Sequence, residues 1–385
     1  MSELRTKIRA ALESYDGIVA VGADNFMYLT GIALPFANNY LDRPALIIKT
    51  IDGQETIICP FDWSDSIMQQ GWKGQIRTYD ENMNSPPRGA IQSLTEVLSE
   101  LKLTDKKLAI DKSRVSNLLF EDMKQKFPKA EWVACDEALR SLRIEKTKEE
   151  VDMLEVAAKH SESGIISALN HLEGTVDVPG YTISEFSERV RVHVYEFGGS
   201  GVGYLATMQG VGGETYYSPP LQFEMLRPGE LVRMDVTNHN RGYWSNAGRM
   251  AVIGEPSQEQ ASAYQDNLKL KEAAVVTLVP GKKSRDVFGA VAAVSKKERI
   301  KFWEDVGVGH GVGVSDREPP YLNRSDDTTL KPGMVIALDI YTFGPRKELI
   351  HSKDTYEIVE HGCRLLSWYR NWDRLYAVTG VRSTH

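Results

Sequence analysis

Four separated segments of this 385-residue chain each hold a titratable side chain next to a glycine turn or within a predicted strand. Their central residues are Asp235 in VRMDVTNHNRGYWSNAGRM, His310 in GVGHGVGVSDREPP, Asp339 in LKPGMVIALDIYTF and Lys353 in HSKDTYEIVEHG. Carboxylates together with an imidazole are the groups that general acid–base catalysis uses and that divalent metal ions bind. The four segments together predict one catalytic or metal-binding site.

Each of these residues by itself has a simpler structural explanation. A lone aspartate at a strand end is usually a turn or cap residue, and a histidine between glycines is more often structural than catalytic. A Pro-Gly pair marks only a turn. The functional interpretation therefore depends on the joint order and spacing of the four segments.

The part of the chain that must position these residues shows helices, strands, helices and strands in that order. This order predicts an α+β domain with a hint of internal duplication. Thr147 and Glu150 form a capping-box pattern, which begins a long helix that opens the domain. Further helices are expected near 183–197, 257–278 and 284–297, and strands near 203–209, 230–237, 242–253, 334–343 and the DTYEIVE segment.

The preceding part alternates helix and strand patterns and predicts a smaller α/β domain. Two apolar runs bracket Asp52 and Gly53, which is a strong hairpin signal. Strands are expected at 17–21, 44–49, 55–60 and in KLAID, and helices near 61–70, 87–102 and 115–126. We therefore expect two domains, residues 1–142 and residues 143–385.

The composition excludes several classes of protein. The formal net charge of -7 argues against nucleic acid as the main partner, because phosphate binding needs a basic surface. Cys59, Cys135 and Cys363 are far apart and in no metal-ligand spacing, so we expect no disulfide framework and a cytoplasmic location. The polar N-terminus lacks the apolar core of a signal peptide, and no segment is apolar enough to span a membrane.

The four segments, with the opening DNFMYLTG and the boundary IEKTKEEVDML, resemble the pita-bread family of methionine aminopeptidases, aminopeptidase P, prolidase and creatinase. The resemblance covers essentially the whole chain. It implies an α+β protein in which a creatinase-type α/β domain precedes a pita-bread catalytic domain. It also implies a homodimer, in which an N-terminal loop residue such as Arg43 could reach the partner's site and bind a substrate carboxylate.

The resemblance implies a metal site that this chain has altered. The metallopeptidases of the family use two Asp, one His and two Glu. Of these, the first Asp corresponds to Asp235 and the His to His310. The second Asp position holds Asn246, the first Glu position Asp339 and the second Glu position Lys353. Four carboxylates have become two carboxylates and an ammonium, so we expect no dimetal cluster and at most one weakly held divalent ion, on Asp235, His310 and Asp339.

An alternative alignment leaves one point open. A shift of one residue would put Asp354 in place of the missing Glu. In a regular strand that shift sends the side chain to the opposite face, so this alignment requires a bulge.

Creatinase, which cleaves a C–N bond without metal, is a metal-free precedent within the family. The histidine that creatinase uses has no counterpart in MQGVGGETYYSPP, where Tyr216 and Tyr217 stand near the aligned positions. Creatinase also has a Glu where this chain has Gly248, and its remaining active-site Glu aligns with Lys353. Creatine is therefore not indicated as the substrate.

The remaining groups suggest specific roles. His310 is the expected general acid/base, since an unperturbed imidazole titrates near neutral pH. Lys353 is expected to act as a fixed positive charge that pairs with Asp235 and Asp339, and Glu318 could accept a proton. The residues expected to contact substrate are Asn246, Tyr216, Tyr217 and Arg43. The simpler alternative is that Lys353 only forms a salt bridge in an inactive site.

These roles favour a metal-independent hydrolase that cleaves a C–N or similar bond of a small, polar, carboxylated substrate and needs no cofactor. An elimination reaction at the same site is the first alternative. A metal-dependent Xaa-Pro peptidase is the second, and a catalytically inactive binding protein is the third. The fold by itself does not choose among them.

Overall fold

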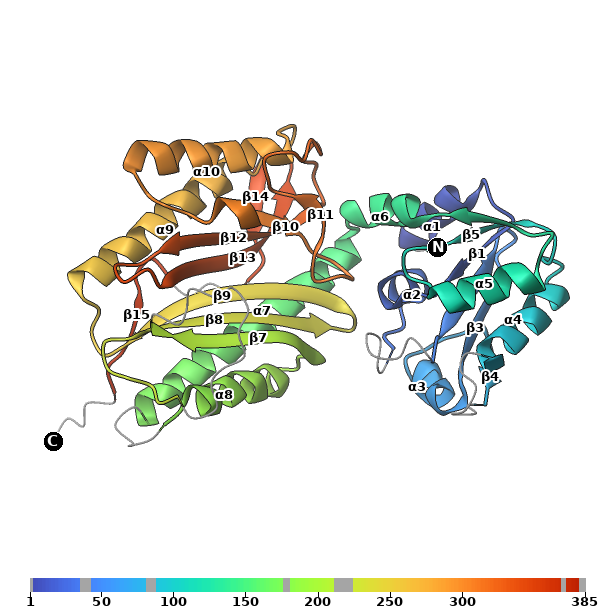
Figure 1. Ribbon diagram of the computed structural model, residues 1–385, viewed down its shortest axis with the longest axis horizontal. Coiled ribbons are helices and arrows are strands. Elements are labelled where there is room, and N and C mark those ends of the chain that lie inside the picture. Colours follow the sequence, from blue (N-terminus) through green and yellow to red (C-terminus); the bar gives the residue numbers. More distant parts are fainter. Residues whose placement is uncertain are drawn as a thin grey trace. The chain divides into compact units, whose positions relative to one another are not determined.

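The computed structural model describes residues 3–34, 43–80, 88–175, 181–210, 224–367 and 372–380. The chain divides into two compact units, Met1–Arg143 and Ile144–His385, and each is described by itself (Figure 1). No helix in these described ranges is long and apolar enough to cross a membrane. All three cysteines have free thiols.

The first unit contains a six-stranded sheet, in which the described strands have the order β4-β3-β2-β1-β5-β6. Its strands are β1 (Gly17–Ala20), β2 (Leu46–Thr50), β3 (Glu55–Pro60), β4 (Gln75–Tyr79), β5 (Lys107–Ile110) and β6 (Glu131–Ala134). Its helices are α1 (Glu3–Leu12), α2 (Ala23–Thr30), α3 (Ser64–Gln69), α4 (Arg88–Glu100), α5 (Asn117–Lys126) and α6 (Asp136–Ile144). The α/β class expected for this unit is confirmed.

The hairpin between β2 and β3 forms where the Asp52-Gly53 pair predicts it. Gly53 has a φ of 94°, a left-handed conformation that glycine adopts without a steric penalty. Its N–H donates to the main-chain oxygen of Thr50 at 3.1 Å, which closes the turn. Helix α4 then packs Leu94 and Leu98 against the buried residues of the sheet.

The second unit contains a nine-stranded sheet with the path β11-β10-β12-β13-β9-β8-β7, while β14 pairs with β13 and β15 with β9. Its strands are β7 (Gly201–Gln209), β8 (Leu231–Asn240), β9 (Tyr243–Ile253), β10 (Gly309–Gly311), β11 (Glu318–Tyr321), β12 (Val335–Phe343), β13 (Leu349–Val359), β14 (Gly362–Leu365) and β15 (Tyr376–Val378). Its helices are α7 (Lys148–Thr175), α8 (Ile183–Glu196), α9 (Gln258–Thr277) and α10 (Ser284–Glu298).

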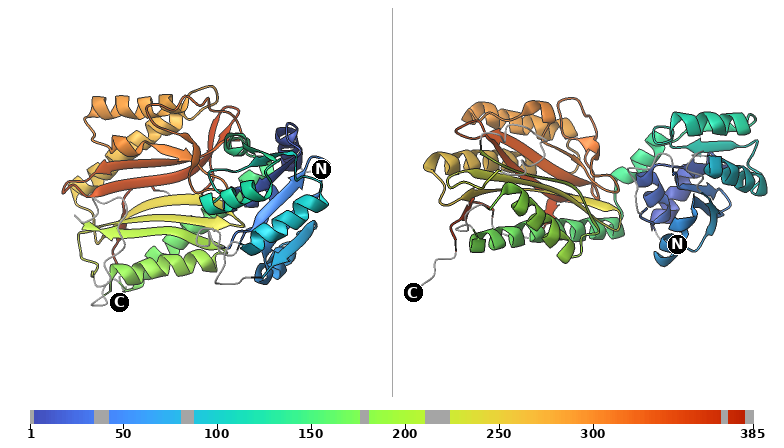
Figure 2. Two further views of the ribbon diagram at one scale, coloured as in Figure 1. Left: turned by 45° about the vertical axis from the view of Figure 1, so that its right-hand side comes forward. Right: turned by 60° about the horizontal axis from the view of Figure 1, so that its bottom comes forward.

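This unit consists of two similar halves, as the repeated order of helices and strands suggests. Helices α7 and α8 pack on β8 and β9, and α9 and α10 pack on β12 (Figures 1 and 2). The strand residues that contact the helices alternate along each strand, for example Val232, Met234 and Val236 on β8. Because successive side chains of a strand point to opposite faces, Asp235 must lie on the face away from the helices.

The long helix α7 begins where the sequence predicts it. The N–H of Thr147 donates to the carboxylate of Glu150 at 2.8 Å, and the N–H of Glu150 donates back to the hydroxyl of Thr147 at 3.4 Å. These reciprocal bonds satisfy main-chain donors that a helix start would otherwise leave without partners. The other helices and strands expected in this unit are also present, and the strand that carries Lys353 already begins at Leu349.

Candidate active site

Three of the predicted residues lie in one row across the sheet of the second unit. Asp339 on β12 is directly opposite Lys353 on β13, and Lys353 is directly opposite Gly248 on β9. Gly248 is in turn opposite Asp235 on β8. Residues that are directly opposite share a face of the sheet. The row therefore places both acids and the lysine on the face away from the helices.

The ammonium of Lys353 lies between the two acids. Its Nζ is 3.6 Å from Oδ1 of Asp235 and 3.4 Å from Oδ2 of Asp339. All three side chains are almost fully buried. Burial by itself raises the pKa of the Asp339 carboxyl, but the charge of Lys353 and the hydrogen bond from His351 outweigh it, and this pKa lies well below its usual range. Asp339 is therefore an ionised carboxylate at neutral pH.

The other oxygen of each carboxylate contacts a ring that the sequence analysis missed. The hydroxyl of Tyr341 donates to Oδ2 of Asp235 at 3.2 Å, and Nε2 of His351 lies 2.7 Å from Oδ1 of Asp339. Tyr341 follows Asp339 by two residues and His351 precedes Lys353 by two. The two-residue period of a strand could have indicated that these rings share the face of the acids.

Gly248 makes room for this arrangement. A Cβ atom at position 248 would lie 2.2 Å from Cε1 of His351 and 2.7 Å from Cβ of Lys353. Any other residue at this position would displace one of these side chains. The glycine in the NAG segment is thus a packing requirement of the site.

His310 is completely buried on β10, and its protonation differs from the expectation. Its Nδ1 lies 2.9 Å from the main-chain oxygen of Gly311, so Nδ1 carries the hydrogen and Nε2 presents a lone pair. Burial, together with the positive charges of Lys353 and Arg317, lowers the pKa of this imidazole to about 3. His310 is therefore neutral at physiological pH, with the lone pair of its Nε2 available to accept a hydrogen bond or a proton.

Asn246 attaches a loop to its strand. It lies on β9 two residues before Gly248, on the same face of the strand. Its Nδ2 donates to the main-chain oxygen of Asp316 at 3.1 Å, and the N–H of Trp244 donates to the main-chain oxygen of Gly313 at 2.7 Å. Both bonds attach the loop between β10 and β11 to β9. The expected contact of Asn246 with a substrate stays a prediction.

Glu318 has a partner that the sequence did not predict. Its Oε1 lies 2.8 Å from Nζ of Lys146, and both side chains are buried. The pair holds the start of β11 to the segment before α7, and the role of Glu318 as a proton acceptor stays a prediction. Lys146 could not have been identified from sequence, because 172 residues separate the two partners.

Asp354 does not take the place of the missing Glu. The pairing of β12 with β13 is regular from Val335 to Phe343, without the bulge that this alignment requires. Asp354 instead lies 2.6 Å from Nη2 of Arg249 and 2.9 Å from Nζ of Lys271. Burial alone raises its carboxyl pKa, but these two cations outweigh burial and hold it well below the usual range. Lys353 is therefore the residue at the site.

Three other residues expected to contact substrate are not part of the geometry described above. Tyr216 and Tyr217 lie outside the described residues. Arg43 contacts its own unit, where Nη2 lies 2.8 Å from Oδ1 of Asp62 and the guanidinium lies over the ring of Trp63. Its contact with a substrate stays a prediction.

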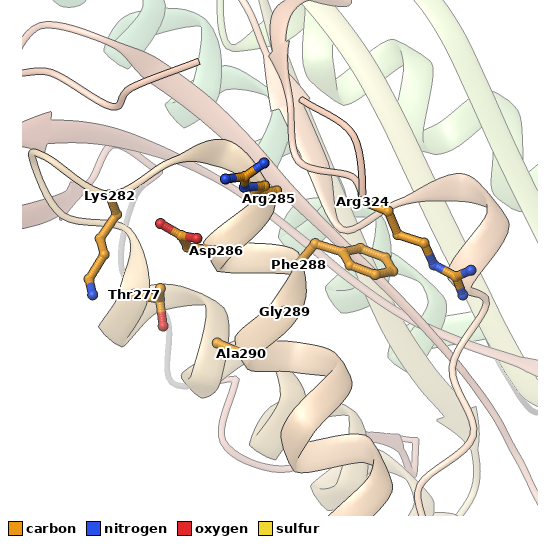
Figure 3. Close-up of a pocket in the computed structure, with 8 residues that line it drawn as sticks. All are labelled: Thr277, Lys282, Arg285, Asp286, Phe288, Gly289, Ala290 and Arg324. Carbon is orange, nitrogen blue, oxygen red and sulfur yellow. The ribbon is translucent and has the colours of Figure 1, made fainter. Parts of the chain in front are cut away.

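A surface hollow of about 620 Å³ lies at α9, α10 and the loop that carries Arg324 (Figure 3). It is lined by Thr277, Lys282, Arg285, Asp286, Phe288, Gly289, Ala290 and Arg324. None of these residues belongs to the row of Asp339, Lys353, Gly248 and Asp235. The hollow is wide open, and its Arg285 and Arg324 pair with exposed carboxylates, so we do not assign the chemistry to it.

Comparison with known proteins identifies the family and agrees with this fold. Residues 135–360 match the metallopeptidase family M24, and residues 2–144 match the creatinase/prolidase N-terminal domain. The chain belongs to metallopeptidase family M24. This assignment confirms the predicted fold and places the chain among hydrolases.

Individual relatives of this family extend over most of the chain. An Xaa-Pro dipeptidase of Pyrococcus furiosus is 25% identical over 254 residues, which are 66% of this chain and 71% of that protein. An X-Pro aminopeptidase structure from Thermotoga maritima has a TM-score of 0.82 at 18% identity and covers 97% of this chain and 98% of its own. A prolidase structure from Thermococcus sibiricus has a TM-score of 0.80 at 22% identity and covers 97% of each chain.

The family name implies metal ions, and the donor set can be tested for them. Asp235 and Asp339 carry two negative charges, and Lys353 already lies between them with one positive charge. One oxygen of each acid is further engaged by Tyr341 or His351. Two unit charges about 4 Å apart interact by about 4 kcal/mol at an effective dielectric of ~20, so a divalent ion beside the ammonium would be strongly repelled. These residues do not fit a pair of divalent cations.

Proposed function

We propose that this chain is a metal-independent hydrolase that cleaves a C–N bond of a small, polar, carboxylated substrate. The observation that carries the proposal is the position of the Lys353 ammonium, 3.6 Å from Asp235 and 3.4 Å from Asp339. An ammonium in this place supplies the positive charge that a hydrolytic site needs beside a developing oxyanion. The homodimer and the cytoplasmic location expected from sequence stay predictions.

In the proposed reaction, the oxygen of a water molecule bonds to the carbonyl-type carbon of the substrate. Lys353 stabilises the negative charge that develops on the carbonyl oxygen. The Nε2 lone pair of His310 accepts the water proton and returns it to the leaving nitrogen as the C–N bond breaks. The products are a carboxylate and a protonated amine, so the atoms of substrate and water are all accounted for. Asp235 and Asp339 hold the ammonium in place.

The first experiment measures the metal content and the metal dependence together. Protein purified without chelators is analysed for divalent ions, and it is then assayed on N-acyl amino acids and related small carboxylated amides with EDTA or with Mn²⁺. We expect far less than one divalent ion per chain and activity that EDTA leaves unchanged. Lys353→Met should lower kcat by about 10²–10³-fold, as the loss of one electrostatic donor does in other enzymes. Lys282→Met, at the surface hollow, is the matched control. Two divalent ions per chain would overturn the proposal.

A metal-dependent Xaa-Pro peptidase is the second candidate. The family relative from Pyrococcus furiosus, which is an Xaa-Pro dipeptidase, favours it. Xaa-Pro dipeptides in the same assay decide between the two functions. Turnover that EDTA abolishes and Mn²⁺ restores would support the peptidase. The double variant Lys353→Glu with Asn246→Asp restores carboxylates at both altered positions. It should gain divalent-ion binding if Lys353 is what excludes the metals.

A further inference from the structure

Each carboxylate of the site has two oxygens with two different kinds of partner. One oxygen of Asp235 faces Lys353 and the other accepts from Tyr341 at 3.2 Å. One oxygen of Asp339 faces Lys353 and the other lies 2.7 Å from Nε2 of His351. Because Asp339 is ionised and can only accept, Nε2 of His351 must donate to it. Both acids are thus held by a ring donor on one side and by the ammonium on the other.

The two ring donors are themselves in contact. Tyr341 and His351 are directly opposite each other on β12 and β13. Their rings are stacked, with centroids 4.1 Å apart and planes 8° from parallel. His351 also fits against Gly248, where a Cβ atom would come within 2.2 Å of its ring. Close packing of this kind restricts ring rotation, so the two donor atoms keep fixed positions.

We propose that the stacked pair Tyr341 and His351 is the positioning device of this site, which turns one oxygen of each acid toward Lys353. The pair imposes on Asp235 and Asp339 the order that bound metal ions would otherwise impose. This inference deepens the proposed function, because it rests on Lys353 being the resident cation. It assigns both rings a role through the acids and Lys353, without contact to the reacting atoms.

The energetic test is a set of double-mutant cycles with Lys353→Met, read by urea unfolding. Tyr341→Phe and His351→Phe keep an aromatic ring and remove the donor. If the rings orient the acids toward Lys353, the effects of each ring variant and of Lys353→Met should not add. The unfolding equilibrium constant of the double variant should differ about tenfold from the value that the two single variants predict together. Tyr79→Phe is the matched control, because it removes a buried hydroxyl in the first unit that donates to Pro44. It should be additive with Lys353→Met.

A spectroscopic test separates positioning from general stabilisation. The Nζ signal of Lys353 is assigned in ¹⁵N-lysine NMR spectra by its loss in Lys353→Met. Tyr341→Phe and His351→Phe should shift this signal, while His351→Gln, which keeps an N–H donor near Asp339, should shift it less. If His351→Phe does not fold, Tyr341→Phe and His351→Gln decide the matter.

The inference requires both results. Additivity within twofold in the cycles, or a Lys353 signal that the ring variants leave unchanged, would overturn it. The proposed function fails separately, because metal analysis tests whether Lys353 is the resident cation and the cycles test whether the rings orient the acids.

Discussion

Arg249 donates from Nη1 to the main-chain oxygen of Lys353 at 2.7 Å and to that of Gly248 at 2.9 Å. Lys353 and Gly248 are the one directly opposite pair that links β13 to β9 among the described residues. The guanidinium thus joins the two halves of the sheet at the position of the site. On the helix face its Nη2 contacts Glu162 and Asp354. Arg249 therefore connects the backbone at the site with the buried charges on the face of the sheet that the helices cover.

Replacement of this arginine should be strongly destabilising. Arg249→Met would leave Glu162 and Asp354 buried with fewer positive partners, and loss of one member of a buried ion pair costs about 3–5 kcal/mol. Urea unfolding of the variant measures the loss. Lys271→Met removes the more exposed partner of Asp354 and should cost less. An equal or smaller loss for Arg249→Met would contradict the proposed joining role.

The close contacts at Gly248 predict a second effect on stability. Gly248→Ala places a Cβ atom within 3 Å of His351 and Lys353, and overpacking of this kind costs about 1–3 kcal/mol. Gly289 on α10 is the matched control, since a Cβ there meets nothing within 4 Å. Gly289→Ala should instead stabilise the helix by about 0.5–1 kcal/mol. Thermal unfolding of both variants would show opposite shifts, and two shifts of the same sign would contradict this account.

The buried pair of Lys146 and Glu318 gives a third prediction. Lys146→Met leaves the Glu318 carboxylate buried without its ammonium and should cost about 3–5 kcal/mol. The double variant Lys146→Met with Glu318→Gln should recover much of that loss, because the buried charge is then gone. The exposed pair of Lys331 and Glu145, 2.6 Å apart, is the control, and Lys331→Met should cost less than about 1 kcal/mol. Equal losses at the two pairs would count against a buried anchor.

The low pKa of His310 predicts how stability depends on pH. The folded imidazole titrates at about 3, whereas the unfolded one titrates near 6.5. The unfolded chain therefore binds more protons between these values, and stability must fall as the pH decreases from 6.5 toward 3. The contribution is about 1.4 kcal/mol per pH unit in that window. Asp339, whose folded pKa is also depressed, adds to the loss only near and below the unfolded value of about 3.9.

His310→Asn tests this assignment, since its amide can still donate to Gly311 but does not titrate. Urea unfolding at pH 7 and pH 5 should show about 2 kcal/mol less pH dependence in the variant than in the wild type. Half-buried His239, whose pKa is also lowered by burial, contributes equally to both proteins and cancels in the comparison. An unchanged pH dependence would show that His310 is not held neutral by the fold.

The row of Asp235, Asp339 and Lys353 could be predicted from the sequence because each residue lies in a short local motif. The spacing of each motif and the two-residue period of a strand place Asp235, Asp339 and Lys353 on one face. The alternative with Asp354 needed a bulge, and only the regular pairing of β12 with β13 rules it out. The partners Tyr341 and His351 follow the same period, and could have been found from it. Lys146 and Arg249 could not, because their partners are distant in the chain and only the packed sheet brings them together. The lowered pKa of His310 likewise depends on burial, which no motif encodes.

Removal of the Lys353 ammonium should raise the pKa of at least one buried acid of the site. Lys353→Met leaves Asp235 and Asp339 as two buried acids without the cation between them, and mutual repulsion should raise at least one of their pKa values above the unfolded value of about 3.9. A carboxyl whose folded pKa is raised contributes stability below its unfolded pKa and loses it as the pH rises through its folded pKa. The variant should therefore gain stability relative to the wild type as the pH falls.

The variant Lys353→Met with Asp339→Asn is the control, because it removes one of the two like charges. Aspartate ¹³Cγ NMR titration of wild type and both variants measures the effect directly. In wild type, Asp339 should remain ionised at pH values well below those at which an aspartate usually titrates, because its pKa is lowered. In Lys353→Met, one carboxyl should titrate above about 4, and in the double variant this shift should disappear. If both acids of Lys353→Met stay ionised as in wild type, Lys353 is not the charge that holds them, and its place between the two carboxylates has no electrostatic consequence.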